Sequence, residues 1–202
     1  MASHFASIDM RDGKSFAETA AAMNLSIFTP TSGTLPNPAA NNEPMHIWFT
    51  RQPDWDVHGC RGAEDLKHAD ESIDAIAALV ANLEASFDYI VLGGFSQGGC
   101  LSLHALRKDW SPKVKGIFSM GSFLVAASQV VTGPLGSGAQ LPVVMMHGAN
   151  DDLVSAEFGR ETAERLETRG IAVSFRSYEG LLHDISADEL NDLLDWVRDL
   201  IK

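Results

Sequence analysis

The stretch that most constrains the fold is residues 88–107, where an apolar run leads into a serine set between glycines. The run DYIVL predicts a strand buried on both faces, as in the centre of a parallel sheet. Gly94, Ser96 and Gly98 then form a G-x-S-x-G sequence, and QGGCLSLHALRK has a helix-forming composition. This order of strand, motif and helix is typical of a nucleophile elbow, whose strained turn lifts a serine hydroxyl above the sheet's carboxyl edge.

A glycine-rich turn of this kind can also bind phosphate, or simply connect a strand to a helix. A serine hydroxyl is a poor nucleophile near neutral pH, so it needs a base, normally histidine, and a carboxylate to orient that base. In the strand–elbow–helix context these partners follow in the order Ser, Asp, His. The motif therefore predicts an aspartate and a histidine further along the chain.

Both partners occur in that order. Asp151 follows the apolar run LPVVMMHG, and His183 follows the next expected strand, within YEGLLHD. The carboxyl ends of parallel strands are where this kind of sheet gathers its chemistry. Of the other histidines, His104 falls in the expected helix and His147 at a strand end, where packing or a hinge accounts for it. The remaining four all precede the serine: His4, His46, His58 and His68.

Short apolar runs alternate with amphipathic segments along the whole chain, which predicts an α/β fold with a mostly parallel central sheet flanked by helices. We expect residues 1–202 to form a single domain. Helices are expected at 15–24, 64–86, 155–170 and 186–202, strands at 25–30, 88–94, 114–121, 141–148 and, near an edge, 171–178, a short extended piece at 46–50, and a long loop at 31–44. The 21 residues between Met120 and Pro142 are too few for a large lid.

Composition and charge exclude some classes of partner and cofactor. The formal net charge of −12 disfavours nucleic acid and anionic membrane surfaces as partners. There are two cysteines, Cys60 and Cys100, no leader-like start and no run of about 18 apolar residues, so we expect a cytoplasmic protein without a transmembrane segment. Cys100 is expected in the core and Cys60 near the surface. No C-x-x-C or H-E-x-x-H occurs, and we expect neither a metal nor another cofactor.

From about Phe16 onward, the segments LGGFSQGGCLSLH, HGANDDLV and YEGLLHD together resemble the acyl-protein thioesterase and lysophospholipase-like carboxylesterase family, most closely its lysophospholipase-like branch. The resemblance implies an α/β-hydrolase fold and hydrolysis of esters or thioesters, with an acylated protein or a lysophospholipid as substrate. It implies Ser96 as nucleophile, His183 as base and Asp151, rather than Asp152, as the triad carboxylate. A peptidase or another lipase would share this triad.

The oxyanion donors are less well defined by the sequence. The backbone N–H of Gln97 follows the serine at a helix N-terminus and is one expected donor. Members of the family supply the second donor from a His-Gly-x-Gly-Asp loop that follows an N-terminal strand. This chain has only MRDGKSFAE in that place, which puts the second donor near Met10 or Arg11. It also predicts that the N-terminal strand region is shortened. Since a lost donor costs about 10²- to 10³-fold in rate, a slow or non-catalytic acyl- or protein-binding relative is the second hypothesis.

Four apolar residues in loops on the expected active-site side are candidates to line an acyl groove. They are Trp48, Phe49, Phe123 and Leu124. Ordinary packing of these loops on the core accounts equally well for each of them.

Overall fold

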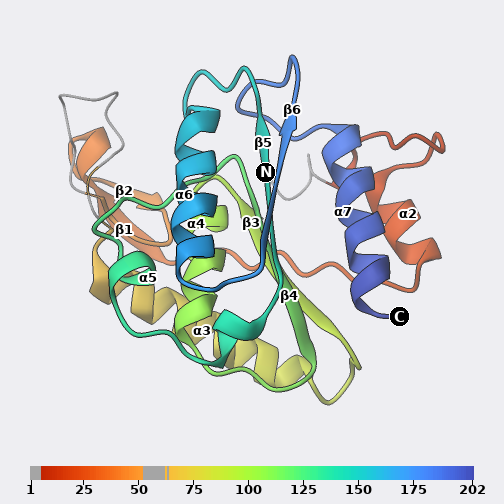
Figure 1. Ribbon diagram of the computed structural model, residues 1–202, viewed down its shortest axis with the longest axis horizontal. Coiled ribbons are helices and arrows are strands. Elements are labelled where there is room, and N and C mark those ends of the chain that lie inside the picture. Colours follow the sequence, from red (N-terminus) through yellow and green to blue (C-terminus); the bar gives the residue numbers. More distant parts are fainter. Residues whose placement is uncertain (1–5, 52–61, 63) are drawn as a thin grey trace.

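The computed structural model describes residues 6–51, 62 and 64–202 (Figure 1). Its main sheet has four parallel strands in the order β3-β4-β5-β6, with β3 at Ile90–Phe95, β4 at Val114–Met120, β5 at Val143–Gly148 and β6 at Val173–Tyr178. Parallel neighbours need long crossover connections, and α4 and α6 are the helices of two of them. The carboxyl ends of β3, β5 and β6 therefore meet at one edge of the sheet.

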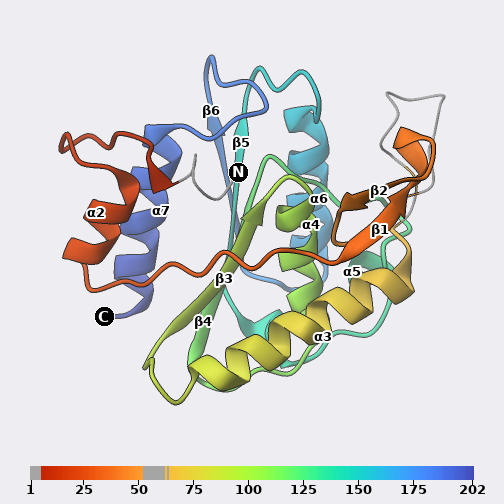
Figure 2. The ribbon, with the colours of Figure 1, turned by 180° about the vertical axis from the view of Figure 1, so that it is seen from behind.

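Helices cover both faces of this sheet, α2 and α7 on one side and α3, α4 and α6 on the other (Figures 1 and 2). Their bounds are α2 Phe16–Ala22, α3 Leu66–Leu83, α4 Gln97–His104, α6 Ala156–Thr168 and α7 Ala187–Leu200. Val143 and Met145 of β5 pack in the core beneath α3, α4 and α6, whereas Val144 and Met146 pack with α2 and α7. This alternation is what a strand buried on both faces requires.

The helix ends follow the sequence signals. Ser186 begins α7 with a capping box to Glu189, as expected, and Ser15 and Glu18 form the same arrangement at α2. After α6, Gly170 adopts φ +79°, the left-handed conformation in which glycine commonly ends a helix. Between β4 and β5 lie only the short helices α5 (Gln129–Thr132) and η3 (Ser137–Gln140), so no large lid is present in this connection, all of which the structure describes.

The N-terminal third departs from the sequence prediction. Residues 25–30 form no strand, since they pair with no neighbour among the described residues, and Ile27 and Phe28 are 41% and 49% exposed. The expected loop at 31–44 instead contains strands β1 (Thr34–Asn37) and β2 (Glu43–His46), paired antiparallel. Two asparagines with positive φ, which that residue type tolerates, lie in the connection between them. Because β2 ends at His46, the piece expected at 46–50 is not a strand.

The position of β3 also differs from the prediction. The sequence predicts a strand at the centre of the sheet, but among the described strands the one neighbour of β3 is β4, which places β3 at an edge. This edge position agrees with the shortened N-terminal strand region that the sequence predicts. No helix in the described ranges is long and apolar enough to span a bilayer.

Candidate active site

The elbow has the strained geometry that its sequence predicts. Ser96 stands between β3 and α4 with φ 53° and ψ −119°, a conformation that non-glycine residues rarely adopt. A Cβ on Gly94 would lie 2.4 Å from the backbone of Gly98, so strand and helix approach each other too closely for any side chain at Gly94. Gly98 itself has room for a methyl group, whose closest neighbour would be 3.8 Å away.

The structure brings Ser96, His183 and Asp151 together from three different loops. Nε2 of His183 lies 3.0 Å from Oγ of Ser96, and its Nδ1 lies 2.7 Å from Oδ2 of Asp151. A carboxylate can only accept, so the imidazole donates from Nδ1 and presents a free electron pair on Nε2 to the serine hydroxyl. The ring also packs against Phe95, at a centroid distance of 4.7 Å. This is the arrangement in which an imidazole accepts a serine proton.

The Asp151 carboxylate is fixed by the loop that carries it. Its side chain is 1% exposed, and its Oδ1 accepts from the backbone N–H groups of Leu153 at 3.0 Å and Val154 at 2.7 Å. These two backbone donors hold the carboxylate in one orientation. The neighbouring Asp152 is exposed.

A second histidine touches the same carboxylate. The sequence predicts a packing or hinge role for His147, yet its Nε2 lies 3.3 Å from Oδ2 of Asp151 and 2.8 Å from the carbonyl oxygen of Val154. Burial lowers the pKa of His147, so its imidazole is neutral at neutral pH. Both facing atoms are acceptors, so Nε2 carries the proton and donates to them. The spacing of four residues to Asp151 is the one sequence signal that could have indicated this contact.

The two expected oxyanion donors differ in their placement. Gln97 is the first residue of α4 and lines the pocket beside Ser96, so its backbone N–H is one of the unpaired donors at a helix N-terminus. Arg11 is not among the described residues that line this pocket, and its side chain instead pairs with Asp188 at 3.0 Å. The backbone N–H of Met10 donates to Lys14. Met10 thus uses its backbone N–H within the N-terminal loop, and the second oxyanion donor stays a prediction.

Of the four apolar candidates for an acyl groove, only Phe123 lines the pocket beside Ser96. The prediction is wrong for Phe49 and Leu124, which are 0% and 1% exposed and belong to the core between the sheet and α3, α4 and α6. Trp48 packs partly buried against that core. Their chain segments pass the active-site side, as expected, but the side chains turn inward because the core is the larger apolar surface available to them.

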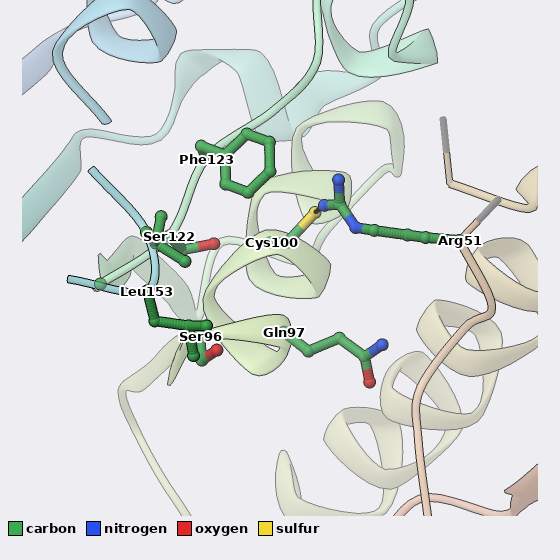
Figure 3. Close-up of a pocket in the computed structure, with 9 residues that line it drawn as sticks. Arg51, Ser96, Gln97, Cys100, Ser122, Phe123 and Leu153 are labelled. Atoms are coloured by element: carbon green, nitrogen blue, oxygen red, sulfur yellow. Dashed lines mark hydrogen bonds between the residues drawn. The ribbon is translucent and has the colours of Figure 1, made fainter. Parts of the chain in front are cut away.

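The pocket contains one charged side chain that no sequence motif indicates. Arg51 lines it together with Ser96 and Cys100 and reaches across it toward the Cys100 sulfur (Figure 3). Its position follows from the contacts of the segment before it. Gln97 accepts from the backbone N–H of Trp48 and donates to the Phe49 carbonyl, both at 2.8 Å, and this fixes the 48–51 segment against α4.

Three potential metal ligands also lie behind the pocket. Donor atoms of Glu64, Cys100 and His104 are all within 4.8 Å of one another. The Arg51 guanidinium already contacts Glu64 and Cys100, both at 3.1 Å, and burial raises the pKa of the Cys100 thiol to about 12. His104 accepts from Arg107 through Nδ1, so its proton lies on Nε2. As arranged, the group binds a guanidinium and is not prepared for a metal ion. Cys100 is buried as expected, and Cys60 lies outside the described residues.

The parallel sheet with helices on both faces, and the serine turn between β3 and α4, define an α/β hydrolase. Residues 11–201 match the family described as Phospholipase/Carboxylesterase, and the chain belongs to that family. This confirms the family resemblance and the fold class that the sequence predicts.

Individual relatives agree with this assignment. The chain is 29% identical to lysophospholipase-like protein 1 of Mus musculus over 86% of its own length and 72% of the mouse protein. It is 26% identical to acyl-protein thioesterase 1 of Debaryomyces hansenii, over 86% of this chain and 75% of that one. The crystal structure of Arabidopsis thaliana SOBER1 superimposes with a TM-score of 0.78 at 22% identity, covering 93% of this chain and 89% of that one, which supports the fold.

Proposed function

We propose that this protein is a serine hydrolase that cleaves carboxylic esters or thioesters through an acyl-enzyme intermediate. The observation that carries the proposal is the continuous hydrogen-bonded sequence from Asp151 through His183 to Ser96, at 2.7 and 3.0 Å. Membership of the Phospholipase/Carboxylesterase family supports the same reaction class.

In the proposed reaction, Nε2 of His183 takes the proton of Ser96 while Oγ attacks the substrate carbonyl carbon. Asp151 stabilises the resulting imidazolium, and the backbone N–H of Gln97 donates to the developing oxyanion. His183 then gives the proton to the leaving alcohol or thiol, and an acyl group remains on Ser96. Water, deprotonated by the same imidazole, releases the acid and restores the serine.

An acylated protein or a lysophospholipid is the proposed substrate class, and the names of the mouse and yeast relatives support it. The exposed side chains of Leu153 and Leu182, each near a triad member in sequence, offer apolar contacts to a partner that presents an acyl group. The low cysteine content supports a reducing, cytoplasmic setting.

The test is hydrolysis of p-nitrophenyl esters from acetate to palmitate, and of the corresponding acyl thioesters, at neutral pH. Ser96→Ala should reduce turnover to background with an unchanged thermal midpoint. Asp151→Asn should lower kcat by several orders of magnitude, because the asparagine amide favours the wrong histidine tautomer. Asp152→Asn, one residue away and exposed, is the matched control and should retain wild-type activity. Equal rates for the wild type and Ser96→Ala would refute the proposal.

A second candidate, an acyl- or protein-binding module, is favoured by the N-terminal loop. Met10 uses its backbone N–H within that loop, and Arg11 is not among the described residues that line the pocket. The two candidates differ in turnover. If the protein is a binding module, a non-hydrolysable acyl ketone should bind saturably and no ester should be cleaved. If it is a hydrolase, esters should be cleaved and Ser96→Ala should remove that activity.

A further inference from the structure

The pocket beside Ser96 is largely apolar, yet a guanidinium forms part of its wall. Arg51 is the one charged side chain among the described residues that line it, and the others are neutral, including Phe123 and Leu153. An apolar acyl chain gains nothing from a cation in this wall. Arg51, which is paired with Glu64, therefore offers a positively charged donor to a ligand that brings a negative charge into an otherwise apolar space.

The guanidinium is fixed in place from several sides. Its Nη2 lies 3.1 Å from Oε1 of Glu64, in an ion pair whose side chains are only 15% and 3% exposed, and it donates to Sγ of Cys100 at 3.1 Å. The rings of Phe123 and Phe49 lie 4.7 and 5.4 Å from its central carbon. Figure 3 shows Phe123 and the guanidinium toward one end of the pocket and Ser96 toward the other. A donor held this firmly loses little entropy on binding a carboxylate.

The spacing between nucleophile and guanidinium limits the length of the acyl group. Cys100, whose Sγ lies 3.1 Å from Nη2 of Arg51, follows Ser96 by four residues and so lies about one turn further along α4, roughly 6 Å of helix rise. The cavity measures about 150 Å³. An engineered cavity of about that volume holds benzene, so the pocket has room for a short acyl group.

Resting on the proposed hydrolase function, we propose that this pocket selects short acyl groups that end in a carboxylate, such as succinyl and glutaryl esters. The ester carbonyl lies at Ser96, the methylene groups contact Phe123 and Leu153, and the terminal carboxylate accepts hydrogen bonds from Arg51. Glu64 orients the guanidinium and balances its charge while the pocket is empty. Because the chain carries a net charge of −12, the preference originates in this local contact and not in the overall field.

The experiment compares two esters of matched shape, monomethyl succinate and methyl 4-methylpentanoate, in which two methyl groups replace the carboxylate oxygens. Methanol release gives kcat/KM for both. Charge-assisted hydrogen bonds predict a preference for the succinate of about tenfold or more in the wild type. Arg51→Met should abolish this preference, because the succinate loses a charge-assisted donor that the apolar ester does not use.

Arg51→Met leaves the buried Glu64 unpaired and is at risk of misfolding, so the double variant Arg51→Met/Glu64→Gln is measured beside it, with thermal midpoints for both. Equal kcat/KM values for the two esters in the wild type would overturn this inference, and so would a succinate preference that survives in a folded double variant. If Ser96-dependent cleavage of the apolar ester persists in either case, the proposed hydrolase function stands. If the wild type showed no Ser96-dependent cleavage of either ester or of the p-nitrophenyl esters, the proposed hydrolase function would be refuted instead.

Discussion

At the scale of single residues, the buried imidazole of His147 is the most informative contact of the proposed triad. It is 0% exposed, and its Nε2 faces both the Asp151 carboxylate and the Val154 carbonyl. The Nδ1 atom has no hydrogen-bond partner among the described residues and lies against Gly159, where a Cβ would come within 2.4 Å of it. The imidazole is therefore held through its Nε2–H group. The same N–H group helps to fix the Asp151 carboxylate, which in turn orients His183.

We expect His147→Leu to lower kcat about tenfold or more for p-nitrophenyl butyrate with little change in KM, because a hydrogen bond to a charged group is worth about 1.5–3 kcal/mol. His147→Gln retains a donor near the position of Nε2 and should recover most of the loss. Steady-state kinetics and thermal midpoints of both variants provide the test. Equal losses of kcat in the two variants, or a loss of stability alone, would show that His147 only fills space.

At the scale of elements, the first turn of α4 does more than present the serine. The Gln97 side chain accepts from the Trp48 N–H and donates to the Phe49 carbonyl, and Ser72 of α3 donates to the Trp48 carbonyl. These contacts join the 48–51 segment to two helices and thereby place Arg51 at the pocket. The same residue that supplies the proposed oxyanion N–H thus also fixes one wall of the acyl site.

Gln97→Ala should lower the free energy of unfolding by about 1–3 kcal/mol, because it leaves two partly buried backbone groups without partners. The variant keeps its backbone N–H, so we expect KM for short esters to rise more than kcat falls. Gln97→Glu is the matched control, since it keeps the acceptor for Trp48 and loses the donor to Phe49. Urea unfolding and steady-state kinetics measure both effects. If kcat alone fell in Gln97→Ala, the Gln97 side chain would act in the chemical step and not by fixing the pocket wall formed by the 48–51 segment.

At the scale of the whole molecule, features with a local cause could be predicted from the sequence. The strand before the elbow, the separate local motifs that contain Ser96, Asp151 and His183, and the capping box of α7 each depend on residues close together in sequence. The structure brings the three residues together, while their catalytic roles stay a prediction. The absence of a strand at 25–30 could not be predicted, because a strand requires a neighbour that the local pattern does not specify. The position of Arg51 at the pocket could not be predicted either, because it depends on packing between segments that are distant in sequence.

The pH dependence of stability is a property of the whole molecule to which one buried carboxyl group, that of Glu189, should contribute. Burial raises the pKa of Glu189 to about 7, with smaller contributions from the charges of Asp184 and Asp151, against 4.5 for the free side chain. Between these values the folded chain holds a proton that the unfolded chain has lost. The contribution of Glu189 is therefore present below about pH 4.5 and is lost as the pH rises to about 7.

Glu189→Gln mimics the protonated carboxyl group and retains an oxygen to accept from the Ser186 N–H, as Glu189 does at 3.0 Å. We expect the two proteins to be similar in stability near pH 4.5 and the variant to be more stable above pH 7, by up to a few kcal/mol. Urea unfolding of both proteins across pH 4.5 to 8 measures the difference. The many other carboxylates of this acidic chain are common to both proteins, so they cancel in the comparison. A difference that stays constant over this range would show that folding does not raise the pKa of Glu189.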